Sequence, residues 1–311
     1  MSSLFSTPDH PFKSFQYFFM IDLKELYGID TFGAIPLSEC VISKPYLLER
    51  AGLPADGGGS ALLFLLPYYT MAGEGGNVSM YAVAEDYHEY AGTLFADLCP
   101  RLKEIMPEGR FAGFVDHSPV LEVDAAAKAG LGVYGENGLL ISEAYSSFVF
   151  IGGVYTDLDA SAWKNLVGAA ARREYAPGYC SGCGACRRAC PVGAIGGRGH
   201  IDCEKCFSAV TQKKRLTKGD EGAVAGAEYV WGCDICQLVC PVTARAKNAG
   251  TLETPLSYFK QKLIKTLDED TLSELCRSGE FSRRAFAWRG EAVVGRNLQL
   301  REKRDKNDDH N

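Results

Sequence analysis

Two short runs of cysteines in the second half of the chain constrain its fold more than any other feature. The first run is Cys180-x2-Cys183-x2-Cys186-x3-Cys190, followed by Pro191, and the second is Cys233-x2-Cys236-x3-Cys240, followed by Pro241. The first has the spacing of bacterial ferredoxins, in which three thiolates hold one [4Fe–4S] cluster and the fourth, before proline, reaches a second cluster. The second run repeats this pattern without its first cysteine. The sequence therefore predicts a segment that binds two clusters and transfers electrons.

The two runs leave one cluster ligand to be found. Each cluster takes four thiolates, so two clusters need one more than the seven that the runs supply. The candidates between the runs are Cys203 and Cys206, and spacing alone does not choose between them. With crossed ligation, one cluster takes Cys180, Cys183, Cys186 and Cys240, and the other takes Cys190, Cys233, Cys236 and either Cys203 or Cys206.

Other uses of these cysteines fit the pattern less well. Structural zinc sites usually combine two separated Cys-x2-Cys pairs, not three cysteines closed by Cys-Pro. Disulfides are disfavoured because no signal-peptide pattern precedes the chain, and reduced thiolates suit a cytosol. Cys40, Cys99 and Cys276 stand alone, and we interpret each as a small buried apolar residue.

The length and net charge of the chain limit the number of domains and the kinds of molecule that it can bind. The 311 residues indicate about two domains. The net charge of −6 argues against broad nucleic-acid binding, so we expect no DNA partner. The basic run at 213–215 has two interpretations, a local nucleic-acid-binding patch and a solvent-exposed face beside a cluster loop. The second fits at least as well as the first. The apolar run at 15–23 is interrupted by Gln16 and Asp22 and is too short to span a bilayer. We expect no membrane contact and a cytoplasmic location.

Periodicity divides the chain into three parts. Residues 1–175 read as an α/β domain, 176–250 as the double-cluster domain, and 251–311 as helices with a charged, disordered tail from Arg301. Apolar runs predict strands, and helical spacing or composition predicts helices. The expected strands are 61–67, 111–115, 138–141 and 147–155, and the expected helices are 86–105, 119–129 and 163–175.

Several segments outside the two cysteine runs resemble the epoxyqueuosine reductase family. They are Asp86-Tyr87-His88, the stretch 114–122, Ala129-Gly130-Leu131-Gly132, the stretch 135–141, and Trp231-Gly232-Cys233-Asp234-Ile235-Cys236-Gln237 with the cysteine and proline after it. The resemblance covers roughly residues 60–245, and a weaker match follows at residues 295–298. It implies a nitroreductase-like cobalamin-binding domain followed by a ferredoxin-like double [4Fe–4S] domain. It also implies a relation to corrinoid reductive dehalogenases.

The resemblance carries specific expectations for residues and partners. It favours Cys206 over Cys203, because Asp202 precedes it by four positions and Ser208 follows it by two. It places a proton donor above the corrin at Asp116. Cobalamin contacts are expected near Leu140, Ile151 and Ser208. An external electron donor of flavodoxin or ferredoxin type is implied, with a substrate that is either tRNA or a small modified nucleoside.

The chain also departs from the family pattern. Glu136 replaces a lysine, Gly138 a Thr or Ser, His117-Ser118 a Thr-Gly, and Val242-Thr243 a Trp-Asn. Full-length members carry a helical-repeat domain after the clusters that helps to grip tRNA, and too few residues follow Pro241 for such a domain here. We therefore expect a shortened member that reductively removes an epoxide oxygen. The alternatives are a reductive dehalogenase-like enzyme acting on a small molecule and a non-catalytic electron carrier.

Asp116 needs an environment that suits a proton donor. An ordinary aspartic acid has a pKa of about 3.9, so burial among apolar neighbours would have to raise it. Phe114, Val115 and Pro119 are apolar enough for that. The alternative role for Asp116 is the N-cap of the helix that follows. His88 nearly matches an Asp-x-His-x-x-Gly cobalt-ligand pattern, but the glycine comes one residue late, so a helix-surface or capping histidine is the better interpretation.

Overall fold

A four-stranded antiparallel sheet forms the centre of the molecule. The structure is a computed structural model that describes residues 20–167 and 179–308. The strands lie in the order β1 (Phe32–Pro36), β2 (Ser60–Pro67), β6 (Val149–Thr156) and β3 (Phe111–Val115). Each neighbouring pair is antiparallel, with Leu65 opposite Ile151 and Val115 opposite Gly152. The expected strands at 61–67, 111–115 and 147–155 are confirmed to within two residues.

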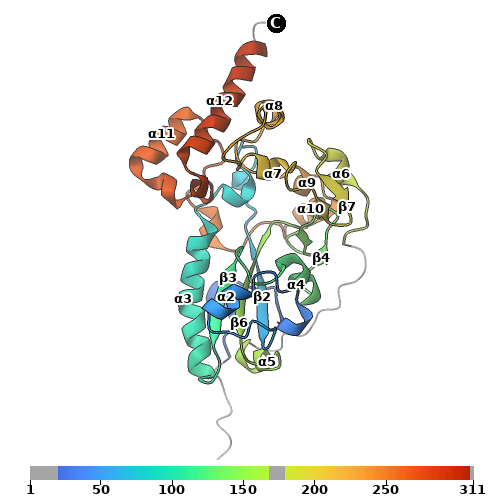
Figure 1. The fold of residues 1–311 in the computed structure, drawn as a ribbon, viewed down its shortest axis with the longest axis vertical. Coiled ribbons are helices and arrows are strands. Elements are labelled where there is room, and N and C mark those ends of the chain that lie inside the picture. The colour runs from blue at the N-terminus through green and yellow to red at the C-terminus, as the bar shows by residue number, and fades with distance from the viewer. Residues whose placement is uncertain (1–19, 168–178, 309–311) are drawn as a thin grey trace, which may run out of the picture.

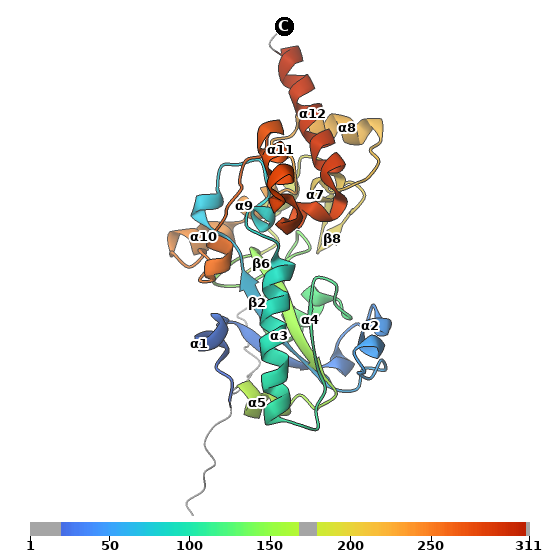
Figure 2. The same cartoon turned by 90° about the vertical axis from the view of Figure 1, so that its left-hand side faces the viewer.

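Strand β2 is apolar throughout because both of its faces are covered. Leu62, Phe64 and Leu66 pack on one side with helix α3 (Tyr87–Ile105). Alternate side chains such as Leu63 pack on the other side with helix α4 (Glu122–Lys128). The period-two alternation of a strand therefore sends its side chains into two separate apolar clusters. Figures 1 and 2 show α3 running along one side of the sheet.

The helices of this unit differ in part from expectation. The long helix predicted at 86–105 is confirmed as α3, whose N-cap carboxylate, Asp86, accepts the backbone N–H of His88 at 2.9 Å. The helix expected from Pro119 begins only at Glu122, because Leu121 keeps an extended backbone. The helix predicted at 163–175 corresponds to α5 (Ala162–Val167), and the rest of that prediction lies outside the described residues.

The cysteine-rich segment folds into short helices joined by turns. Two of these helices begin directly after a cysteine, so the first turn of each helix sets the position of that thiol. Cys206 is the N-cap of α7, and Cys240 is the N-cap of α10. The elements are α6 (Ala185–Ala189), β7 (Ile195–Gly197), β8 (His200–Ile201), α7 (Phe207–Val210), α8 (Lys218–Gly226), α9 (Ile235–Leu238) and α10 (Pro241–Asn248). Figure 1 shows this segment at one end of the sheet.

The C-terminal segment packs back onto both preceding parts. It contains α11 (Glu269–Ser278) and α12 (Glu291–Asp308), and α12 packs against α8. The buried amide of Asn297 on α12 donates to the carbonyls of Thr211 and Val230 at 2.8 and 3.0 Å. The largest apolar cluster combines side chains from all three predicted parts of the chain. The division at 175 and 250 therefore stays a prediction about domains.

The tail predicted to be disordered from Arg301 is wrong as far as Asp308. Residues 301–308 continue α12. The physical reason is that Arg, Glu and Lys are good helix formers, and the preceding turns of α12 are anchored by buried Val294 and Leu298. Charged residues that favour helix therefore continue the helix when its preceding turns are already packed against the protein.

The remaining elements are short. They are α1 (Leu23–Tyr27), α2 (Pro45–Arg50), the pair β4 (Val133–Tyr134) and β5 (Leu140–Ile141), and 3-10 turns at Leu37–Glu39, Met71–Gly73, Met80–Ala82, Ser257–Lys260, Glu280–Arg283 and Ala285–Arg289. Within the described ranges, no helix combines the length and the apolar character needed to cross a bilayer.

Candidate functional site

Five thiols from the two cysteine runs line one small cavity of about 120 Å³. Cys236 also lines a second, larger cavity, whereas Cys180, Cys183, Cys186 and Cys240 do not. Burial raises the pKa of Cys186, and the nearby thiols of Cys180 and Cys240 add to the effect. Cys240 thus lies with Cys180, Cys183 and Cys186 although more than fifty positions separate it from them. We call Cys180, Cys183, Cys186 and Cys240 the outer thiol set. These are the four residues that crossed ligation predicts for one cluster, and that assignment stays a prediction.

A second group of thiols lines a larger cavity of about 560 Å³. It contains Cys190, Cys206, Cys233 and Cys236, which we call the inner thiol set, and Cys203 also reaches the wall. Burial raises the pKa of Cys233 to about 12, with smaller contributions from Asp234 and the thiols of Cys206 and Cys190. Burial likewise raises the pKa of Cys236 to about 12, with help from the Cys233 and Cys206 thiols.

The geometry distinguishes the two candidates for the last ligand. Cys206 lies close enough to Cys233 and Cys236 to influence the pKa of both. Cys203 is exposed, and its thiol donates to the carbonyl of Ile201 at 3.8 Å. Cys206 is therefore the better candidate for the inner set, and its role as a ligand, which the family resemblance implies, stays a prediction.

Backbone turns and N–H donors complete both thiol sets. Gly182 and Gly184 have φ values of 69° and 71° on either side of Cys183, a left-handed conformation that lets the loop curl around the cavity. The backbone N–H groups of Glu136 and Ala194 donate to the sulfurs of Cys180 and Cys190 at 3.4 and 3.2 Å. Such donors to sulfur help to set the reduction potential of a cluster. No three His, Cys, Asp or Glu side chains in the described ranges are arranged around a single metal ion.

The inner thiol cavity adjoins a further cavity that contains Asp116. This neighbour encloses about 210 Å³ and shares four wall residues with the thiol cavity. The shared residues are Leu139, Ser147, Val149 and Phe150. Leu140 and Ile151 line the Asp116 side, and Ser208 lines the thiol side. All four residues expected to act on or contact cobalamin thus line two adjoining, largely apolar cavities. A large apolar cavity with a few polar groups suits a cofactor.

Asp116 lies directly after β3, in a strained backbone conformation. Its φ is 59°, a region that non-glycine residues occupy rarely and often at functional sites. Its carboxylate accepts a hydrogen bond from the Tyr87 hydroxyl at 2.8 Å. Two expectations are corrected here. Asp116 is not a helix N-cap, because α4 begins after Leu121. Its side chain is not desolvated by its apolar neighbours, since it is 65% exposed in the turn that follows the strand.

The sequence did not predict that His88 and Tyr87 lie next to the Asp116 carboxylate. The ring of His88 binds Asp86 at 2.8 Å, and its other nitrogen lies 3.8 Å from the Asp116 carboxylate. The hydrogen bond to Asp86 raises the pKa of His88. Burial, and then the Asp116 carboxylate, raise the pKa of Tyr87, which keeps its hydroxyl a donor. The Asp86-Tyr87-His88 motif was the available signal, but spacing did not show that α3 directs these side chains to Asp116.

Glu122 at the start of α4 holds the Asp116 turn from the other side. It accepts the backbone N–H of Asp116, and burial together with the Asp116 charge raises its pKa to about 8. Lys44 lowers that pKa in part. The neighbouring His117 contacts Lys44 at 3.4 Å and Tyr46 at 3.1 Å through its two ring nitrogens. The turn that carries Asp116 is therefore held by contacts with three other segments.

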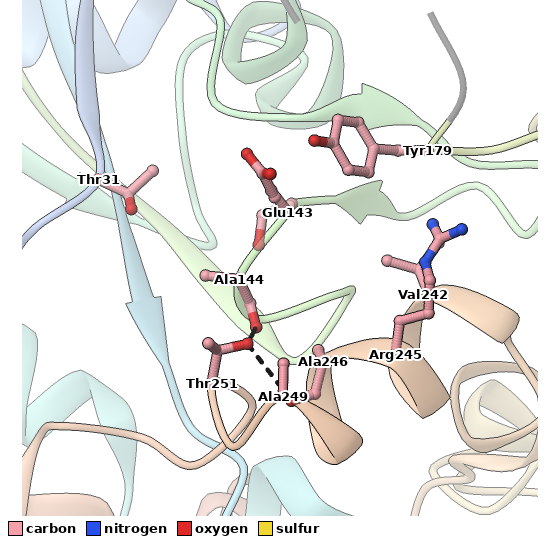
Figure 3. Close-up of a pocket in the computed structure, with 10 residues that line it drawn as sticks. Thr31, Glu143, Ala144, Tyr179, Val242, Arg245, Ala246, Ala249 and Thr251 are labelled. Carbon is pink, nitrogen blue, oxygen red and sulfur yellow. Dashed lines mark hydrogen bonds between the residues drawn. The ribbon is translucent and has the colours of Figure 1, made fainter. Parts of the chain in front are cut away.

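A separate cavity lies outside the outer thiol set. It encloses about 420 Å³ between the loop after β5 and helix α10. Figure 3 shows Tyr179, Glu143 and Arg245 around this cavity, with Arg245 on α10. Tyr179 and Arg245, together with Val242, also line the outer thiol cavity. The outer thiols are thus separated from this cavity by only a few side chains.

Comparison with known proteins agrees with this geometry. Residues 179–243 match the family described as a 4Fe-4S double cluster binding domain. The chain is 32% identical over 230 residues to the epoxyqueuosine reductase of Gloeobacter violaceus, covering 72% of this chain and 68% of that protein. It is 30% identical over 228 residues to the epoxyqueuosine reductase of Lactococcus garvieae, covering 72% of this chain and 60% of that protein.

Solved structures agree on the fold. A selenomethionine-labelled epoxyqueuosine reductase superposes with a TM-score of 0.70 at 20% identity, covering 89% of this chain and 78% of that one. An epoxyqueuosine reductase in complex with a tRNA-Tyr epoxyqueuosine-modified stem loop gives a TM-score of 0.69 at 19% identity, over 89% of this chain and 78% of that one. The expected mixed helix-and-sheet fold with a double-cluster segment is confirmed.

Proposed function

This chain belongs to the epoxyqueuosine reductase family of oxidoreductases, and we propose that it reductively removes the epoxide oxygen of a queuosine precursor. The observation that carries the proposal is the pair of adjoining cavities that connects the inner thiol set to Asp116. Electrons from a cluster at the inner set would arrive where a proton donor lies. Reduction of an epoxide to an alkene and water consumes two electrons and two protons, so both must reach one place.

The proposed cofactors are two [4Fe–4S] clusters and cobalamin. We assign one cluster to the outer thiol set and the other to the inner thiol set. Cobalamin, when bound between the inner set and Asp116, would supply a cobalt centre that accepts single electrons and reduces the substrate. Leu140 and Ile151 would form its apolar floor on the sheet side, and Ser208 would contact it from α7. The apolar walls that the two cavities share support this placement because they exclude water from the reacting atoms.

The chain's own side chains would manage the protons. Asp116 is the proposed proton donor to the leaving oxygen, because bound cobalamin and substrate would cover the carboxylate that solvent reaches here and so desolvate it. The Tyr87 hydroxyl, which donates to Asp116 at 2.8 Å, fixes the orientation of the carboxylate. His88 has a raised pKa and an exposed ring, so it can return a proton from solvent towards Asp116. The exposure of Asp116 supports access of a bulky substrate to that carboxylate.

The proposed substrate is epoxyqueuosine within tRNA, with the free nucleoside as the second form to test. The related structure in complex with a tRNA-Tyr epoxyqueuosine-modified stem loop supports the tRNA form. Family membership favours this reaction over dehalogenation, and the large cavity beside the inner thiols favours an enzyme over a pure electron carrier. A cytoplasmic location, where tRNA and reduced thiols are found, completes the proposal.

Anaerobic reconstitution tests the proposal directly. The protein would be loaded with iron, sulfide and cobalamin, then reduced with dithionite in the presence of epoxyqueuosine tRNA or the free nucleoside. We expect conversion to queuosine by mass spectrometry of the digested nucleosides. Binding of cobalamin would be followed separately by its visible spectrum. If neither substrate is converted by protein that carries both clusters and cobalamin, the proposed function is wrong.

A further inference from the structure

Four arginines gather around the outer thiol set. Arg187 and Arg188 lie on α6, Arg198 lies in the turn between β7 and β8, and Arg245 lies on α10. All four are exposed, and no ion pair joins any of them to another described residue. Arg188 donates to the carbonyl of Cys183 at 2.9 Å, so this group borders the thiol loop itself. The chain as a whole carries a net charge of −6, which makes this local positive charge unusual within it.

Nearby carboxylates offset this charge only in part. Glu136 accepts the backbone N–H of Arg198 at 2.9 Å. Glu143 interacts with Tyr179 in the cavity that Arg245 also lines. Two carboxylates therefore stand against four guanidinium groups, and the face keeps a positive excess.

The same face presents a small apolar centre and an exposed ligand. Leu238 and Val239, at the end of α9, are 44% and 41% exposed. Helix α6 packs against α9, and Figure 1 shows both at the same end of the molecule. Cys183 is exposed, whereas Cys233 and Cys236 of the inner set are partly buried. A short tunnelling path from solvent therefore begins at the outer set.

We propose that this arginine face, formed by Arg187, Arg188, Arg198, Leu238, Val239 and Arg245, docks a small acidic protein that donates single electrons. The inference rests on the proposed function and names its electron-entry surface. In each encounter the reduced donor loses one electron, and the cluster held by the outer thiol set gains it. No bond is made or broken in this step. Two encounters supply the electrons for one epoxide reduction.

The composition of the face fits such a partner. Transient redox complexes bury small interfaces. Complementary charge steers their encounter, so their rates depend strongly on salt. An exposed apolar pair at the end of α9, which packs against the arginine-bearing helices α6 and α10, offers both features to a carboxylate-rich donor. Arginine also binds carboxylates in a bidentate manner, which fixes the orientation of the docked protein.

Stopped-flow kinetics with a purified acidic flavodoxin in its hydroquinone state tests the inference. Protein that carries both clusters should oxidise the flavodoxin with a second-order rate constant that falls steeply as salt rises. The double reversal R187E/R245E should lower that rate constant at low salt about tenfold or more and flatten its salt dependence. Calorimetric titration with oxidised flavodoxin should show a matching loss of affinity without any turnover.

The matched control is R50E/K164E, which changes the net charge equally at exposed positions on α2 and α5. It should behave as the unmodified protein. Iron content and the visible cluster spectrum verify that each variant is assembled. If R187E/R245E does not assemble, R187Q/R245Q and the salt dependence of the unmodified protein replace it. Each flavodoxin rate constant is compared with the dithionite-driven turnover of the same variant, because a small reductant needs no docking face, so the loss with flavodoxin should exceed any change with dithionite.

Three results would overturn the inference. One is an unchanged flavodoxin rate in assembled R187E/R245E, and another is an equal loss in the control. The third is a loss of tRNA binding with unchanged flavodoxin kinetics, which would make the face a nucleic-acid surface. A failure of the proposed function is distinguishable, because the unmodified protein would then not convert epoxyqueuosine even with dithionite.

Discussion

The two thiol sets face different surroundings although the same kind of sequence motif supplies both. The outer set borders solvent through Cys183, with Arg188 bound to the Cys183 carbonyl and Arg245 in the cavity wall. The inner set is more deeply placed, with burial raising the pKa of Cys233 and Cys236 to about 12. Its cavity continues to Asp116 through shared walls. In the proposed relay this difference sets a direction: electrons would enter at the outer set and leave from the inner set towards the substrate.

The largest expected effect follows from removing one inner ligand. Cys206→Ser should remove the inner cluster, so that iron falls from about eight to about four per chain and epoxide reduction stops. The outer cluster should still accept electrons from a donor. Cys203→Ser is the matched control and should keep both clusters. Iron analysis with electron paramagnetic resonance checks the pair, and an intact inner cluster in Cys206→Ser would contradict the ligand assignment.

The next effect tests the end point of the relay. Asp116→Asn should lower turnover about a hundredfold or more, as loss of a proton donor usually does. Both clusters and cobalamin should remain bound, because Asp116 belongs to neither thiol set. Single-turnover assays with dithionite measure the chemical step. Turnover equal to that of the unmodified protein would remove Asp116 from the reaction and leave the inner cavity without an assigned acid.

A smaller loss of turnover is expected when Asp116 is kept but the hydrogen bond that orients its carboxylate is removed. Tyr87→Phe removes the hydroxyl that donates to the carboxylate at 2.8 Å. A hydrogen bond to a charged group contributes about 1.5–3 kcal/mol, so turnover should fall about tenfold. Single-turnover assays with dithionite measure the loss. A change in substrate affinity without a fall in turnover would argue against this positioning role.

The smallest effect concerns stability at the Asp116 turn. Burial raises the pKa of Glu122 to about 8 in the folded protein, above an ordinary value of about 4.3. Its contribution to stability is therefore fully present below about pH 4.3 and is lost as pH rises through about 8. Glu122→Gln should remove this part of the pH dependence. Urea unfolding between about pH 4.3 and about pH 8 measures it, with Glu89→Gln, an exposed carboxylate on α3, as control.

The same contrast between regions explains what could be predicted from the sequence. The thiol sets are encoded by local spacing, so the short runs sufficed to expect crossed ligation. The Asp116 region is assembled from the end of β3, the start of α3 and the start of α4. The family resemblance named Asp116, but neither it nor local pattern gave any account of the left-handed backbone, the exposure or the bond to Tyr87. Strands with continuous apolar runs, such as β2, were predictable for the same local reason.

The expectations that failed concern segments whose conformation depends on distant contacts. The tail beyond Arg301 looks disordered by composition, yet it continues a helix that is anchored elsewhere. The helix expected at Pro119 starts late, because the residues before Glu122 take part in the turn that presents Asp116. No sequence pattern predicted the contacts of His117, because its partners Lys44 and Tyr46 lie at the start of α2, far from it along the chain. Long-range contacts of this kind carry no local signature.

The Asn297 amide has a consequence for how the molecule assembles. By bridging the carbonyls of Thr211 and Val230, it joins the last helix to the two backbone stretches that flank the inner cysteines. A nascent chain can make these two hydrogen bonds only after translation has passed residue 297, so α12 secures the inner cysteine segment late in synthesis.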